Sequence, residues 1–213
     1  MARKRLDSEA RRTQIVKVAI ECIAKEGVHE ATFSKIAKAA KVQQSLLNYY
    51  FPSSEALLIE CVHAVLDSLK AHMIAAIERE MSQPEQALIS YMLSPVDWIE
   101  DNPELQPTWI YFYHLAALNP RFRQLNNEIR RTGRERIAFL VFRILEARKI
   151  TLKDPWTADG LAWALQSMTT GFVAMTATED ADYPKLKSMM KASVDTFLAS
   201  DDVFGPAPRG KKR

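Results

Sequence analysis

Cysteine is scarce in this sequence, and long apolar runs are missing. The only two cysteines, Cys22 and Cys61, form no CxxC pair. This argues against a cysteine-based zinc site and against a disulfide framework. No run of about 18 apolar residues occurs, and the N-terminal residues lead into a charged segment rather than an apolar signal core. We therefore expect no membrane partner and a cytoplasmic location.

Enzyme signatures are missing as well. The six glycines are scattered, so that no P-loop or GxGxxG fingerprint is formed, and neither GxSxG nor HExxH occurs. Glu60 and His63 have the ExxH spacing found in di-iron helical bundles, but those sites need two such pairs on neighbouring helices. We expect no catalytic site, no metal and no other cofactor.

Charge is distributed unevenly along the chain. Residues 1–50 contain 10 Lys/Arg against 5 Asp/Glu, whereas residues 51–213 contain 19 against 21. A basic segment attached to a nearly neutral body is typical of a nucleic-acid-binding module. The composition, 47% hydrophobic and 26% charged, is that of a folded protein, and the length suits one small and one larger domain.

The hydrophobic pattern is helical throughout and predicts an all-α fold of about nine helices. The first helix is expected from Ser8 to Glu26, with Gly27 as its C-terminal cap. Two short helices follow, one capped by Thr32 or Ser34 and one starting at Gln43, with a spacing that suggests a helix-turn-helix. A long helix, capped by Ser53, is expected from about residue 54 to residue 81. Later helix starts are marked by Ser82-Gln83-Pro84, Asn102-Pro103, Asn119-Pro120, Asp154-Pro155 and Asp182-Tyr183-Pro184.

These elements predict three parts. Residues 1–52 form a helix-turn-helix DNA-binding domain. Residues 53–200, entered through the long helix, form a helical domain for ligand sensing and dimerisation. Residues 201–213 combine Gly205-Pro206 with a basic end and are expected to be a disordered tail.

The stretch 32–57 separates an apolar from a polar face. Small and apolar residues such as Ile36, Leu47 and Phe51 can pack two crossing helices against the first one. The remaining polar face can enter the major groove of DNA, where Gln and Asn pair with adenine edges. The candidate DNA-binding residues are Thr32, Lys35, Lys41, Gln43, Gln44, Ser45, Asn48, Tyr49 and Ser54.

The same stretch resembles the DNA-binding segment of the TetR family of regulators. The matching positions are Thr32, Ile36-Ala37, Ala40, Val42, Leu47, Tyr50-Phe51, Ser53 and Leu57. The resemblance covers about the first 60 residues, and beyond them only helix order and proline punctuation are similar. It implies a regulator that binds a palindromic double-stranded DNA operator as a homodimer and is released by a small-molecule inducer of unknown identity.

The resemblance favours a repressor. Transcriptional activation stays open as an alternative, because the sequence does not distinguish a repressor from an activator. A helical adaptor for protein partners, without DNA binding, is the alternative from another class. It leaves the register of residues 32–57 unexplained.

Three positions depart from the family pattern. Lys41 stands where glycine is usual in the turn, and a left-handed conformation there costs about 1–2 kcal/mol. Asn48 and Ser54 replace a tyrosine and a lysine that commonly contact phosphates. The departures imply fewer contacts to the DNA backbone. Lys41, Lys35 and the N-terminal arm Arg3-Lys4-Arg5 can compensate, the arm by lying in a minor groove.

Large, soft side chains in the second half suggest a pocket between helices for an apolar or cationic small molecule. The candidates are Tyr91, Trp98, Trp109, Phe112, Tyr113, His114, Gln166 and Thr169. Two apolar stripes near the C-terminus suggest a two-fold interface made of four helices. Its candidates are Leu161, Leu165, Met168, Phe172, Leu186, Met189, Met190, Val194 and Phe197.

Overall fold

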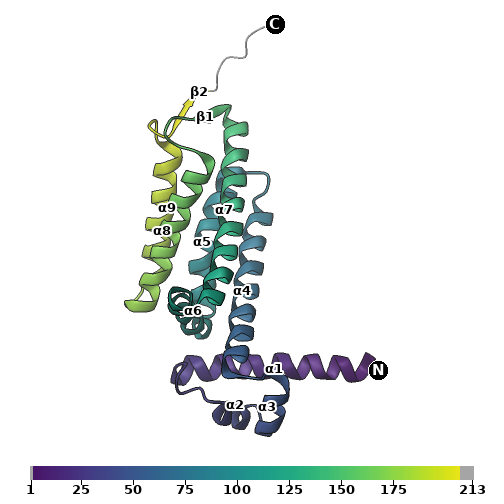
Figure 1. Cartoon of the computed structure of the whole chain (residues 1–213). Coiled ribbons are helices and arrows are strands. Elements are labelled where there is room, and N and C mark those ends of the chain that lie inside the picture. The colour runs from purple at the N-terminus through teal and green to yellow at the C-terminus, as the bar shows by residue number, and fades with distance from the viewer. Residues whose placement is uncertain (1, 207–213) are drawn as a thin grey trace. The chain divides into compact units, whose positions relative to one another are not determined.

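The structure is a computed structural model that describes residues 2–206, with side chains from Ser8 onward (Figure 1). Within these residues it contains nine α-helices, one 3₁₀ helix and two short strands, which confirms the all-α prediction. In chain order the elements are α1 (Ala2–Glu26), α2 (Phe33–Ala39), α3 (Gln44–Tyr50), α4 (Ser54–Arg79), α5 (Pro84–Asp101), η1 (Pro103–Leu105), α6 (Gln106–Leu118), α7 (Pro120–Arg148), β1 (Ile150–Leu152), α8 (Ala158–Thr178), α9 (Tyr183–Ala199) and β2 (Phe204–Pro206).

The chain divides into two compact units. The head unit comprises the residues up to Lys70 together with Asp101–Phe122, and the bundle unit comprises Ala71–Glu100 together with the residues from Arg123 onward. The helix α4 therefore begins in the head unit and ends in the bundle unit. The segment with η1 and α6, which the sequence assigned to the second domain, is grouped with the helix-turn-helix.

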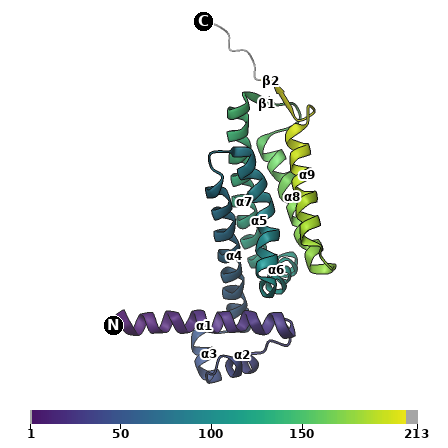
Figure 2. The same ribbon diagram turned by 180° about the vertical axis from the view of Figure 1, so that it is seen from behind.

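The head unit is built on α1. Its residues Ile15, Ala19 and Ile23 recur at a spacing of four and are fully or almost fully buried. The two short helices α2 and α3 lie against this helix (Figure 2). Each has seven residues, a length at which an isolated helix is not stable in water. Burial of Leu47 and Phe51 therefore supplies the stability that α3 lacks by itself.

Several helix ends follow the caps expected from sequence. Gly27 ends α1 with a φ of 85°, and the Ser53 hydroxyl accepts a hydrogen bond from Ala56 N at 3.1 Å at the start of α4. Asn119 and Asp182 cap α7 and α9 by accepting bonds from Arg121 N and Lys185 N.

Two expected helix starts are wrong. Asn102-Pro103 begins only the 3₁₀ helix η1, in which Asn102 makes no capping bond with its side chain. Asp154-Pro155 lies in a turn closed by Trp156 N, which donates to Lys153 O at 2.8 Å. Helix α8 starts later because the hydroxyl of Thr157 caps it, accepting a bond from Gly160 N at 3.0 Å.

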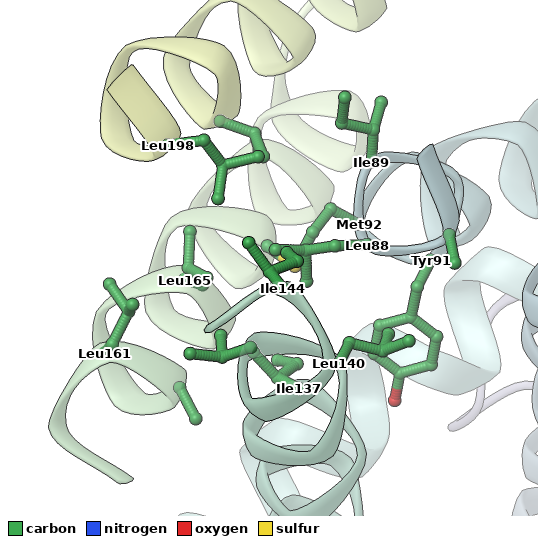
Figure 3. Packing of buried hydrophobic residues seen from close by; sticks show 14 of the residues in the cluster. Leu88, Ile89, Tyr91, Met92, Ile137, Leu140, Ile144, Leu161, Leu165 and Leu198 are labelled. Carbon is green, nitrogen blue, oxygen red and sulfur yellow. The ribbon is translucent and has the colours of Figure 1, made fainter. Parts of the chain in front are cut away.

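The core of the bundle unit lies between α5, α7, α8 and α9 (Figure 3). Leu88 and Met92 of α5 meet Ile144 of α7, Leu165 of α8 and Leu198 of α9, and all five side chains are buried. Met73 and Ile77, from the end of α4, pack against the same cluster. No helix in the described part of the chain is both long and apolar enough to cross a membrane.

The prediction of a disordered tail is wrong for residues 201–206, which are ordered and include the strand β2. The strand β2 pairs antiparallel with β1, with Phe204 opposite Leu152, and Lys153 N donates to Val203 O at 2.9 Å. Val203 and Phe204 expose only 3% and 8% of their surface and belong to the bundle core. The sequence prediction failed because two apolar residues are too short a signal to reveal packing. The rest of the predicted tail, residues 207–213, lies outside the described residues.

We predict that Phe204→Ala lowers the free energy of unfolding by about 3–5 kcal/mol, because it removes a buried aromatic ring from the core. Asp202→Ala, two residues away and exposed, is the matched control and should change it by less than about 0.5 kcal/mol. Urea denaturation followed by circular dichroism measures both. Equal midpoints for the two variants would mean that this segment contributes nothing to the fold.

Candidate functional site

The exposed face of α3 carries only polar side chains, all of which are able to form hydrogen bonds with a partner. Gln44, Ser45, Asn48 and Tyr49 are all exposed, and Tyr49 exposes 79% of its surface. Gln43 precedes them at the N-cap position, where its side chain makes no capping bond. On the opposite face Leu47 is completely buried. The result is a short polar ridge held from behind by apolar packing, a shape suited to the major groove of DNA.

The turn between α2 and α3 has the strained residue expected from sequence. Lys41 has a φ of 55°, in the left-handed region that favours glycine. The turn is closed on both sides, since Lys41 N donates to Lys38 O and Val42 N donates to Ala37 O. The Lys41 side chain is exposed, so that the strain places a cation next to α3.

We predict that Lys41→Gly raises the free energy of unfolding by about 1 kcal/mol, because glycine adopts this φ without steric cost. Lys41→Ala removes the same charge but keeps the strained Cβ, and should give no such gain. Thermal and urea denaturation of the two variants separate backbone strain from charge. If both variants gained the same free energy of unfolding, the gain would result from loss of the cation and not from relief of backbone strain.

Lys35 and Thr32 are engaged within the head unit. The Lys35 ammonium lies 2.8 Å from a Glu26 carboxylate oxygen and 3.0 Å from one of Glu30. Hydrogen bonding to these carboxylates raises the pKa of Lys35, and the bond with Lys35 lowers the pKa of Glu26. The Thr32 hydroxyl caps α2 by accepting a bond from Lys35 N. The pairing argues against the expected use of Lys35 as a phosphate contact, because two carboxylates already neutralise it.

Arg12 of α1 fixes the end of α3, and the sequence interpretation missed it. Its guanidinium donates to Tyr50 O at 3.2 Å, forms an ion pair with Glu60 at 3.0 Å and lies 4.8 Å above the Phe51 ring. Its position three residues before Ile15, at the edge of the apolar stripe of α1, was the available signal. Arg12 thus connects α1 with the residues that end α3 and with α4.

Within the ExxH pair, Glu60 is bound to Arg12 and His63 is exposed. A second pair with this spacing, Glu26 and His29, straddles the end of α1 at Gly27, and Glu26 is bound to Lys35. No group of three potential metal ligands occurs among the described residues.

Four of the expected pocket residues belong to α6 in the head unit. Trp109 and Phe112 are buried and lie side by side, and the Tyr113 ring meets Trp109 edge-on at 5.2 Å. His114 does not join this aromatic cluster. It is exposed and lies next to the Tyr111 ring at 5.6 Å, because it falls on the other face of the helix.

The other four belong to the bundle unit, where two of them converge on one glycine. A Cβ added at Gly133 of α7 would come within 2.5 Å of the Gln166 side-chain nitrogen and 3.8 Å of the Tyr91 hydroxyl. Tyr91 is buried, which raises its pKa. The Thr169 hydroxyl faces the sulfur of Met92 at 3.8 Å, and Trp98 is buried. A larger residue at position 133 would require the flexible end of the Gln166 side chain to move.

Two arginines beside Gln166 were not expected from sequence. Arg134 donates to Gln166 Oε1 at 3.4 Å and lies 4.5 Å above the Trp163 ring, and Arg130 donates to Thr170 at 2.6 Å. Gln166 in turn donates to Arg130 O. Their spacing of four on α7 places both on the side that faces α8. The polar groups of this region therefore hold α7 and α8 together.

Four of the expected dimer-interface residues are wrong. Leu161, Leu165, Met190 and Val194 expose at most 1% of their surface, because they build the core of their own chain. Met168, Phe172, Leu186 and Phe197 are half-buried. Only Met189 of the original set is exposed. Helical spacing identified an apolar stripe but did not distinguish the face turned inward from the face turned outward.

Helices α8 and α9 also carry exposed apolar side chains, Met189 among them. Trp163 and Met175 of α8 and Met189 of α9 expose 54%, 42% and 51% of their surfaces. Exposed apolar side chains of this size on two neighbouring helices are typical of a protein–protein interface.

Among known proteins, the clearest similarity is found for the N-terminal segment of the chain. Residues 15–61 match the family described as bacterial regulatory proteins, tetR family. The chain is 30% identical over 115 residues to the HTH-type transcriptional regulator BetI of Agrobacterium fabrum, an alignment that covers 54% of this chain and 55% of the relative. The chain thus spans about half the length of this relative.

Solved structures resemble most of the chain. The TetR family transcriptional regulator PfmR of Thermus thermophilus has a TM-score of 0.66 at 19% identity, with 88% of this chain and 98% of that chain covered. A regulator from Saccharomonospora viridis in complex with choline has a TM-score of 0.69 at 21% identity, with 93% and 99% covered. The helix-turn-helix segment of this chain therefore matches the TetR family of bacterial regulatory proteins, and most of the chain shares its fold with solved regulators.

Proposed function

We propose that the chain is a ligand-responsive transcriptional regulator, in the first place a repressor, that binds a palindromic DNA operator as a homodimer. The single observation that carries this proposal is the exposed polar face of α3, held by the buried Leu47 and Phe51. A protein-interaction adaptor has no need of a seven-residue helix presented in this way. The proposed activity is binding, without catalysis.

The residues of α3 have distinct roles in this proposal. Gln44 and Asn48, four residues apart on one face, have the amide groups that pair with adenine in the major groove. Ser45 and Tyr49 have hydroxyls that reach phosphates. Ser54 begins α4, and the N-terminus of a long helix attracts a phosphate by its dipole and free N–H groups. Lys41 adds a cation next to these groups.

We predict that Gln44→Ala and Asn48→Ala each weaken binding to the preferred operator by about 1–3 kcal/mol while leaving binding to random DNA nearly unchanged, because base contacts carry the sequence information. Selection from a random DNA pool first gives the operator, and fluorescence anisotropy then measures both affinities. Asp67→Ala, at an exposed position of α4 in the same unit, is the control and should match the unchanged protein. Equal losses on operator and random DNA would contradict base readout by α3.

A dimer through α8 and α9 would bring two heads to one palindromic site, where their binding energies combine. The exposed Trp163, Met175 and Met189 support this location of the interface. The buried Met190, in contrast, is unsuitable for a test, since a charge there disrupts the core of the monomer.

We predict that Met189→Lys converts the dimer to folded monomers, because it places a charge in an apolar interface. Phe139→Lys is the matched control, because Phe139 is also an exposed apolar residue of the bundle unit but lies on α7. Light scattering gives the mass and circular dichroism the helix content. Monomers from Phe139→Lys and dimers from Met189→Lys would move the interface to α7.

The inducer in this proposal binds near the aromatic and polar residues of the second half. Choline, bound by the Saccharomonospora viridis regulator, belongs to the cationic class that aromatic side chains favour. Because α4 is a continuous helix that begins in the head unit, it is the proposed route between ligand and operator. Linkage then requires that operator DNA weakens ligand binding by the same factor by which the ligand weakens operator binding.

A further inference from the structure

The head unit contains a cavity of its own, of about 320 Å³. Its wall is formed by α1, the loop after α1, α2, the first turns of α4, α6 and the start of α7. Apolar side chains cover most of it, among them Ile23, Phe33, Ile36, Leu115 and Phe122. All of these residues belong to the head unit. None of the residues expected to form the inducer pocket lines it.

We propose that this cavity is a second small-molecule site, for a compact apolar amine. The proposal goes beyond the function proposed above, since it rests only on the head unit. An apolar cavity of about 150 Å³ is already large enough to bind benzene. The observed volume is about twice that, which suits a ligand of roughly two fused rings.

The charge of the lining selects a cation. Glu55 is its one charged side chain, and neither lysine, arginine nor histidine lines the cavity. Glu26 and Glu60 of the same unit are paired with Lys35 and Arg12, whereas Glu55 forms no ion pair with the described residues. A ligand ammonium therefore finds an exposed, uncompensated carboxylate at the cavity.

The remaining polar groups of the lining are neutral. Burial raises the pKa of Cys61 to about 12, so that its thiol stays protonated at neutral pH and behaves as a small apolar group. Tyr111, half-buried, presents an aromatic ring, on which a cation can also rest. The apolar end of the ligand, away from its ammonium group, would contact Phe33 and Ile36 of the helix-turn-helix.

An occupant of this site would link α2 to α6. Phe33 and Ile36 come from α2, and Tyr111 and Leu115 from α6. At the rim, the His29 ring meets Tyr111 edge-on at 5.9 Å. A ligand that touches both helices stabilises the head unit by mass action.

The test uses the full chain and three probes of one shape: 2-naphthylmethylamine, the neutral 2-naphthylmethanol and the anionic 2-naphthoate. Calorimetry measures their affinities, and methyl NMR locates them. We expect the amine to shift the methyl signals of Ile23, Ile36 and Leu115 and to bind about fivefold more tightly than the alcohol, the gain of one partly exposed ion pair. The naphthoate should bind more weakly than both.

Variants assign the effect to residues. Glu55→Gln should reduce amine affinity to that of the alcohol and leave the alcohol unchanged, while Glu21→Gln, an exposed residue of α1 outside the lining, should change neither. Leu115→Trp fills the cavity and should weaken amine and alcohol together. If that variant does not fold, Ala31→Leu in the loop before α2 fills it instead.

Absence of these methyl shifts at millimolar amine, shifts confined to the bundle unit, or equal binding of the three probes would overturn the proposal. DNA plays no part in the experiment. A failure of operator binding would therefore count against the proposed regulator, and a failure of amine binding only against this site.

Discussion

The candidate DNA-binding surface depends on the burial of Leu47 and Phe51, which holds α3 in the head unit. A helix of seven residues makes too few internal hydrogen bonds to offset the entropy of its formation. Its conformation is therefore imposed from outside, by burial of Leu47 and Phe51. Arg12 adds a polar connection at the exposed edge, where its guanidinium satisfies the carbonyl oxygen of Tyr50 and pairs with Glu60. The polar ridge of α3 is as rigid as this packing makes it.

The same constraint explains why the strained turn is tolerated. Lys41 adopts a left-handed conformation because Ala37, Ala40 and Leu47 must be buried on both sides of a very short connection. Their combined burial exceeds the cost of one strained residue, about 1–2 kcal/mol. A glycine would relieve the strain, but it would also remove the cation next to α3.

In the bundle unit, apolar interactions fill the interior and polar interactions lie at its edge. Its interior is a continuous cluster between α5, α7, α8 and α9 (Figure 3). Polar contacts occur at the edge between α7 and α8. There Arg130 and Arg134 of α7 donate to Thr170 and Gln166 of α8, and Gln166 donates to Arg130 O. A rigid core with exposed apolar groups left on α8 and α9 suits an assembly through those helices.

The sequence by itself determined the two short helices of the helix-turn-helix, the caps at Gly27 and Ser53, the left-handed Lys41 and the polar identity of the α3 surface. These features depend on local propensities and on periodicity within one helix, which a sequence records directly. Only the tertiary structure decided which stripe of α8 and α9 faces inward, that Lys35 is bound by two carboxylates, that Val203 and Phe204 complete the bundle core, and that a cavity lies beside α2. The physical reason is that burial and ion pairing depend on neighbours distant in sequence, and the period of one helix carries no information on what lies opposite to it.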